Sequence, residues 1–182
     1  TLLPNRMMRN DGGTRFVDVT SSGGFGTVQK GHGISFGDID HDGDQDIYQV
    51  LGAAFEGDVY ENALLENPGH GHRWLSLELE GVVSHRDAIG ARIHVSVESE
   101  DGERRSIHVT VGHGGSFGSS PLRQEIGLGN ARRIDSVEVI WPGTLTVHKI
   151  VGLELDHAYH LRQGQTGATP IERETFDLSP DS

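Results

Sequence analysis

Five aspartates stand at every second position of one nine-residue stretch, and this run constrains the chain more than any other feature. It reads Asp38-Ile39-Asp40-His41-Asp42-Gly43-Asp44-Gln45-Asp46. Carboxylates this close repel one another, so an ordered fold keeps them together only if a cation neutralises them. Ca²⁺ fits best, because it takes about six to eight oxygen ligands from a tight loop. The run therefore predicts a calcium site.

The spacing assigns a role to each position of the loop. On a calcium-loop template three side chains bind the ion, a backbone carbonyl follows, and a later carboxylate closes the site. The glycine at position six permits the sharp turn between the two limbs of the loop. The predicted metal ligands are Asp38, Asp40, Asp42, Asp44 through its carbonyl, and Asp46.

Three other interpretations of the run are weighed against this one. An EF-hand needs a bidentate Glu at position twelve and flanking helices, but Gln49 stands there and the flanking segments 33–37 and 47–51 are strand-like. Mg²⁺ prefers fewer protein ligands and more retained water than Ca²⁺. A solvated acidic turn without an ion is the structural alternative.

Two parts of the chain resemble known families. The segment from Gly31 to Tyr48 resembles an FG-GAP or VCBS repeat, the calcium-loop unit of integrin-type β-propellers. Downstream, Arg86–Arg92, Gly127–Gly129 and Val137–Gly143 resemble, in that order, the motifs of the ASPIC/UnbV domain. The resemblance implies such a repeat followed by an ASPIC/UnbV domain, as in cartilage-acidic-protein-like and bacterial secreted proteins.

The rest of the chain predicts an all-β fold. It has 26 glycines in 182 residues, and apolar residues alternate with polar ones through 75–79, 93–97 and 107–111, as in half-buried antiparallel strands. We expect one propeller-type calcium-loop repeat packed on a small antiparallel β-sandwich or barrel. The predicted divisions are 1–73 for a partial and a complete repeat, 74–163 for the β domain, and 164–182 for a loosely attached tail. A turn of helix is expected within 59–65.

A weak internal repeat supports the first division. Residues 5–16 echo residues 62–74, each as a strand, a glycine-rich turn and a second strand beginning at an aromatic residue. Repeat units bury their apolar faces against neighbours, so a lone unit needs a partner surface. Three partner surfaces remain open: further repeats in a longer protein, the C-terminal domain, or another copy of the chain that completes the sheet by strand addition. In the third case the N-terminal half-repeat and the tail are candidate exchange arms.

The net charge and the lack of cysteine restrict the partners and the kinds of site that the protein can have. The net charge of −12 argues against nucleic acid and anionic membrane surfaces as partners. No run approaches the apolar length of a membrane span. There are no cysteines, so neither disulfides nor thiolate metal sites are available. Calcium loops are best supplied outside the cell, which predicts an extracellular location.

No motif predicts catalysis. The chain lacks a nucleophile elbow and a His-Glu-x-x-His helix. The glycine-rich segment 112–120 lacks the following helix that phosphate binding needs, and is interpreted as a surface loop for a ligand or partner. A hydrolase would use His113 with a serine among Ser116, Ser119 and Ser120.

The histidines and tryptophans have structural interpretations as well. His70 and His72 could chelate a metal, but a surface turn is favoured. His94 and His108 fall on the polar faces of strands, where solvent exposure explains them. Trp74 and Trp141 could form a carbohydrate platform, yet both occupy apolar strand positions and are expected in the core.

These observations favour a non-catalytic, extracellular, calcium-binding structural or adhesion module. Its expected partners are other proteins or copies of itself, joined by β-strand addition, with carbohydrate as a further partner. Two alternatives stay open: a self-assembling subunit of an extracellular filament, and the accessory domain of a secreted hydrolase.

Overall fold

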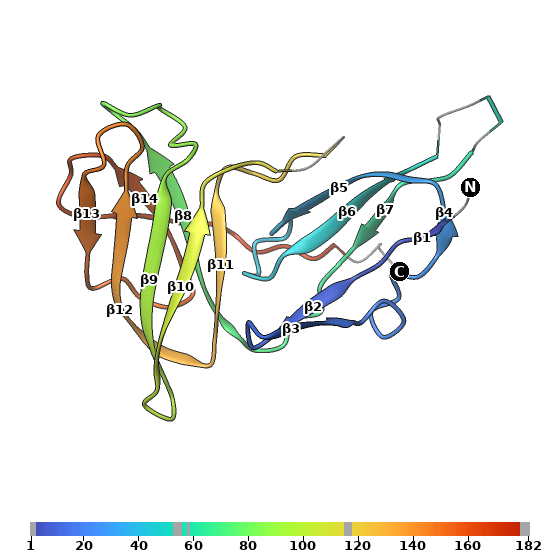
Figure 1. The fold of residues 1–182 in the computed structure, drawn as a ribbon, viewed down its shortest axis with the longest axis horizontal. Coiled ribbons are helices and arrows are strands. Elements are labelled where there is room, and N and C mark those ends of the chain that lie inside the picture. The colour runs from blue at the N-terminus through green and yellow to red at the C-terminus, as the bar shows by residue number, and fades with distance from the viewer. Residues whose placement is uncertain (1–2, 53–55, 58, 115–117, 179–182) are drawn as a thin grey trace. The chain divides into compact units, whose positions relative to one another are not determined.

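The described part of the chain is built from β-strands. The computed structural model describes residues 3–52, 56–57, 59–114 and 118–178, and within these it contains no helix. The strands are β1 (Leu3–Pro4), β2 (Met8–Asp11), β3 (Arg15–Asp18), β4 (Val28–Gln29), β5 (Gly31–Gly37), β6 (Asp46–Leu51), β7 (Ala63–Leu65), β8 (Arg73–Glu80), β9 (Arg92–Ser99), β10 (Arg104–Thr110), β11 (Gln124–Gly129), β12 (Ala131–Ile140), β13 (Val147–Ile150), β14 (His157–Arg162) and β15 (Thr169–Ile171) (Figure 1). The predicted all-β class is confirmed, and the helical turn expected within 59–65 is wrong, because strand β7 forms there.

The strands belong to two compact units that interleave along the sequence. The smaller unit takes its described residues from 1–35, 48–65 and 115–119, and the larger from 36–47, 66–114 and 120–182. The acidic loop between β5 and β6 therefore belongs to the larger unit, together with the β domain that follows it in the sequence.

The larger unit is a sandwich of two four-stranded sheets. One has the order β10-β9-β12-β13 and the other β11-β8-β14-β15. Both sheets contribute to one hydrophobic core, which includes Leu77 of β8, Val95 of β9 and Val137 of β12, all fully buried. The alternation in β9 is the predicted one, since Ile93, Val95 and Val97 face this core. No closed barrel and no propeller forms among the described strands.

The prediction of purely antiparallel sheets is wrong for one pair. β8 and β14 run parallel, with Tyr159 opposite Leu77, while the other registered pairs of the two large sheets are antiparallel. β14 reaches β8 only after the chain has passed through the other sheet. Alternation of apolar residues records which face of a strand is buried and not its direction, so it carried no signal for this pairing.

The smaller unit contains three short sheets, and the internal repeat has different outcomes in its two copies. β2 and β3 pair as an antiparallel hairpin, β1 pairs with β4, and β5, β6 and β7 form a three-stranded sheet. In the first copy both strands lie in one hairpin, with Phe16 exposed. In the second copy β7 and β8 belong to separate sheets, because β8 enters the sandwich. The two copies of the repeat therefore share the order of strand, turn and strand, but their strands pair differently.

The described part of the C-terminal segment belongs to the larger unit. β15 extends the second sheet by pairing with β14, and Arg173 forms an ion pair with Glu78 at 2.8 Å. The interpretation of 164–182 as a loosely attached tail is wrong for its described part, because strand pairing and this ion pair hold it; residues 179–182 lie outside the described residues. No helix in the described chain is long and apolar enough to cross a membrane.

Candidate metal centre

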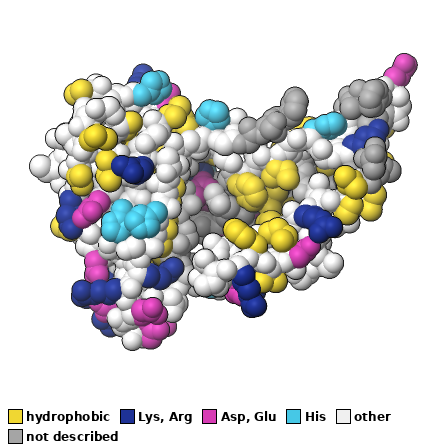
Figure 2. Space-filling model, viewed as in Figure 1, with side chains coloured by type: hydrophobic (Ala, Val, Ile, Leu, Met, Phe, Trp, Pro, Cys, Tyr) yellow, Lys and Arg dark blue, Asp and Glu magenta, His cyan; other side chains and the backbone are white. Residues whose placement is uncertain are grey.

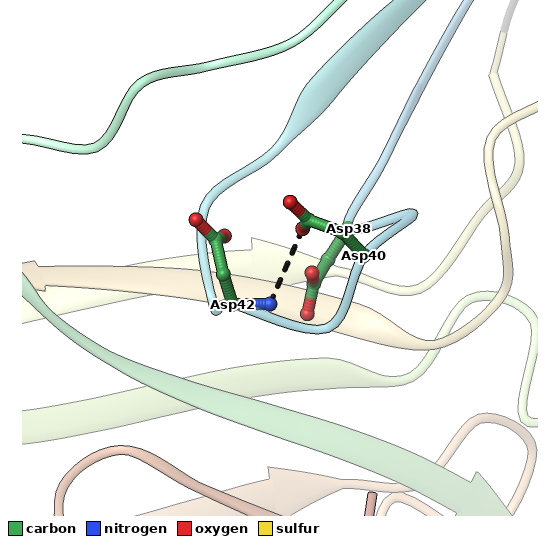
Figure 3. Close-up of side chains that lie close together, drawn as sticks. All are labelled: Asp38, Asp40 and Asp42. Atoms are coloured by element: carbon green, nitrogen blue, oxygen red, sulfur yellow. Dashed lines mark hydrogen bonds between the residues drawn. The ribbon is translucent and has the colours of Figure 1, made fainter. Parts of the chain in front are cut away.

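The acidic loop is a tight turn whose own aspartates hold its backbone. The Asp42 amide donates to Asp40 Oδ1 at 3.3 Å, and the Asp44 amide donates to Asp42 Oδ1 at 2.8 Å. His41 and Gly43 have φ angles of 62° and 95°, in the left-handed region that turns the chain back on itself. The alternating aspartates therefore shape the loop as well as charge it (Figure 3).

Three of the five predicted ligands come together in this turn. Oxygen atoms of Asp38, Asp40 and Asp42 lie within 4.8 Å of one another, with Asp38 and Asp40 on one limb and Asp42 on the other (Figure 3). Asp38 is 4% and Asp40 is 5% exposed. Asp38 Oδ1 is buried and accepts no hydrogen bond. Burying a carboxylate oxygen without a hydrogen-bond partner costs folding free energy. A bound cation would offset this cost at Asp38 Oδ1.

Burial and neighbouring charge disfavour the ionised form of these groups. Burial is the main cause that raises the pKa of Asp38, and the charge of Glu125 adds to it, while a hydrogen bond from the Gly43 amide acts in the opposite direction. Burial also raises the pKa of Asp40, followed by the charges of Asp42 and Asp46. A divalent cation between the carboxylates would offset both effects.

The other two predicted ligands have different surroundings. Asp46 is 2% exposed and uses both oxygens within the fold, because Oδ2 accepts from the Ile39 amide at 3.0 Å and Oδ1 from the Asn67 amide at 2.9 Å. It ties the two ends of the loop together and lies outside the cluster of three. Burial raises the pKa of the Asp44 side chain, and the charge of Asp42 adds to the effect. The role of the Asp44 carbonyl stays a prediction.

Two residues that the sequence did not single out hold the base of the loop. The Asp38 amide donates to Glu125 Oε2 at 2.9 Å, and Gln45 Nε2 donates to the same oxygen at 3.1 Å. Arg123 donates to the Asp38 carbonyl at 3.1 Å and, through Nε, to Glu125 Oε1 at 2.8 Å. Glu125 lies in β11 and Arg123 just before it, and their contacts with the loop join residues 80 to 87 positions apart. No local sequence pattern links the two regions.

The C-terminal segment holds the loop at another point. The Phe176 amide donates to the Asp40 carbonyl at 3.0 Å, and the Phe176 ring meets His41 edge-on, with centroids 5.6 Å apart. His41 Nδ1 also lies 3.1 Å from the Glu174 carbonyl oxygen. The loop is therefore bonded to β11 through both of its limbs and to the C-terminal segment through Asp40.

Gly43 is required for the close approach of an aromatic side chain as well as for the turn. A Cβ atom at this position would lie 2.0 Å from Nε1 of Trp74, the second residue of β8. No side chain fits at that distance without moving the indole. The predicted burial of Trp141 is confirmed at 1% exposure, whereas Trp74 is only partly buried and packs on the loop.

The remaining candidate residues form no comparable cluster in the described residues. His113 is exposed, and its carbonyl accepts from the Ser120 amide at 3.0 Å. Ser116, and with it the centre of the glycine-rich segment, lies outside the described residues. The rings of His70 and His72 are 6.5 Å apart and edge-on. Catalysis therefore stays untested.

Comparison with known proteins gives one family match, and it covers part of the chain. Residues 81–168 match the family model described as ASPIC and UnbV. The match includes all three downstream motifs, so this part of the predicted resemblance is confirmed. A search of curated proteins gives no match. The family match does not reach the acidic loop, so the resemblance of residues 31–48 to an FG-GAP or VCBS repeat stays a prediction.

Replacement of Gly43 by alanine should destabilise the protein more than the same change at a matched glycine. Gly102 has a similar φ of 84°, but nothing lies within 4 Å of its Cβ position. Gly102→Ala should cost about 1 kcal/mol from backbone strain alone. Gly43→Ala should cost roughly 1–3 kcal/mol more, because Trp74 must also move. Chemical denaturation of both variants measures the difference, and equal losses would show that the indole does not constrain the loop.

Proposed function

We propose that this chain is a non-catalytic, extracellular structural or adhesion module whose acidic loop binds Ca²⁺. The observation that carries the proposal is the cluster of Asp38, Asp40 and Asp42, in which a buried oxygen of Asp38 has no hydrogen-bond partner. The cluster supplies hard oxygen ligands of the kind that Ca²⁺ prefers. The resemblance of the loop to an FG-GAP or VCBS repeat supports the same ion.

The three carboxylates would hold the ion, and the rest of the loop would hold the carboxylates. Bound Ca²⁺ supplies the positive charge that lets buried Asp38 and Asp40 stay ionised. Glu125 and Arg123 fix the start of the loop, and Asp46 closes its two ends through amides of the chain. This chain's own contribution is a pre-shaped turn, so little conformational entropy is lost when the ion enters.

The loop contacts suggest what the ion does for the module. Asp38 and Asp40 are bonded through their backbones to β11 and to the C-terminal segment. An ion that orders the loop would therefore also order the attachment of these two segments. The structural role follows from this coupling, and the extracellular location rests on calcium supply.

Ca²⁺ should raise the thermal unfolding midpoint of the protein, and Asp42→Asn should remove most of that rise. A ligand that binds only the folded state adds about 2.7 kcal/mol at one hundred times its dissociation constant. Asp101→Asn is the matched control, because Asp101 Oδ1 accepts the amide of Glu103 two residues on, as Asp42 Oδ1 accepts that of Asp44. Mg²⁺ should give a smaller shift. If the intact protein shows no shift at millimolar Ca²⁺, the proposed function fails.

The stabilisation by Ca²⁺ should grow as pH rises from about 4 to 7. The pKa values of Asp38 and Asp40 are raised above their ordinary 3.8 in the folded protein. Without Ca²⁺ the folded state then binds these protons more tightly than the unfolded chain, which stabilises it at acid pH, and this stabilisation is lost as pH rises through the raised values. Ca²⁺ binds the ionised carboxylates, so its effect should appear over the same interval. Unfolding midpoints with and without Ca²⁺ across this range test the sign, and an increment that is constant with pH would contradict it.

The filament alternative has a separate test. β10 and β13 are the edge strands of one large sheet and could accept a strand from another copy. Against exchange of the C-terminal segment, β15 and Arg173 pair within their own unit. We expect a monomer in analytical ultracentrifugation, with and without Ca²⁺. Concentration-dependent assembly of the intact chain would instead favour the self-assembling subunit.

A further inference from the structure

A row of four polar side chains crosses the outward face of one sheet of the sandwich. The strand registers place His108 of β10 opposite His94 of β9, His94 opposite Glu138 of β12, and Glu138 opposite Lys149 of β13. Their neighbours along β9, Ile93 and Val95, face the core, so the row lies on the other face. Figure 2 shows histidine side chains gathered on the surface where β9 and β10 run in Figure 1.

The two imidazole rings lie directly against each other. Their centroids are 4.6 Å apart and their planes differ by 1°. The His94 side chain is 30% exposed, and its Nε2 atom is buried without a hydrogen-bond partner. Solvent exposure, the explanation that the sequence favoured, therefore does not account for His94. A buried ring nitrogen that makes no hydrogen bond and lies beside a second imidazole is a candidate to bind a metal ion through its lone pair.

Glu138 fixes the orientation of the His94 ring. Glu138 Oε2 lies 3.5 Å from His94 Nδ1, and Lys149 Nζ donates to Glu138 Oε1 at 2.8 Å. The Glu138 carboxyl group therefore contacts Lys149 through one oxygen and His94 through the other. A carboxylate beside Nδ1 favours the proton on that nitrogen and leaves the lone pair on Nε2. Metal-binding histidines are commonly oriented in this way.

We propose that His94 and His108 bind a divalent transition-metal ion of the Zn²⁺, Ni²⁺ or Cu²⁺ class, with Glu138 as the positioning residue. Imidazole nitrogen suits these ions, whereas Ca²⁺ prefers oxygen, so this site is independent of the acidic loop. Tetrahedral ligation needs the two nitrogens about 3.3 Å apart, with water in the remaining positions. The exposed His108 ring can turn to meet this distance, and Lys149, the cation in the row, is already paired with Glu138.

Isothermal titration of the intact, tag-free chain with ZnCl₂ in the presence of Ca²⁺ tests the proposal. We expect a single site of highest affinity, weakened more than about tenfold by His108→Ala and less by Glu138→Gln. Because His108 is exposed, its variant should keep the unfolding midpoint of the metal-free protein. His94→Ala should match His108→Ala, and NMR should show Zn²⁺ shifting the Nε2 resonance of His94 only when His108 is present.

His70→Ala combined with His72→Ala is the control, because those two histidines offer the competing chelate in a turn. This double variant should bind Zn²⁺ as the parent does. Equal affinity of the parent and His108→Ala, loss of binding in the double variant, or no binding at millimolar Zn²⁺ would each overturn the proposal. Absence of a Ca²⁺-induced shift in the unfolding midpoint of the intact protein would not affect it, so the two proposals can fail separately.

Discussion

The pairing of Arg123 with Glu125 is the interaction on which the acidic loop depends. Glu125 accepts hydrogen bonds from both limbs of the loop, one from the backbone amide of Asp38 and one from the side-chain amide of Gln45. Arg123 neutralises the charge of Glu125 and also donates to the Asp38 carbonyl. Without the arginine, a nearly buried carboxylate would face Asp38 and raise the cost of the cluster further. The loop thus receives one negative side chain from β11 and one positive side chain from the residue just before this strand. Because Arg123 and Glu125 form an ion pair, both can hydrogen-bond to the backbone of Asp38 without adding net charge beside the carboxylates.

Local spacing predicted the centre of the candidate site but not its support. The alternation of Asp38, Asp40 and Asp42 around Gly43 is a nine-residue pattern, and the structure brings these three carboxylates together. Asp46 fits the same spacing, yet its oxygens bond to amides, because it stands where the two limbs meet. Glu125 and Phe176 reach the loop through folding of the whole unit. Contacts over such separations leave no periodic trace in one sequence.

The fold shows the same division between local and distant information. Strands such as β9 and β10 were readable, since alternation reports directly on which face is buried. The parallel pairing of β8 with β14 was not, because strand order is decided by core packing between segments far apart in the chain. The row from His108 to Lys149 was also missed. Each residue looks like an ordinary polar-face position until the register of β10, β9, β12 and β13 is known.

The contact between Trp74 and Gly43 gives the protein a built-in optical probe. The chain has two tryptophans: Trp141 is sealed in the sandwich core, whereas Trp74 lies partly exposed against the tip of the acidic loop. An indole responds in its emission to nearby charge and to water, so a change in the loop alters the light from Trp74 while Trp141 supplies a constant background. The residue that excludes a side chain at position 43 is also the one that makes the state of the loop visible.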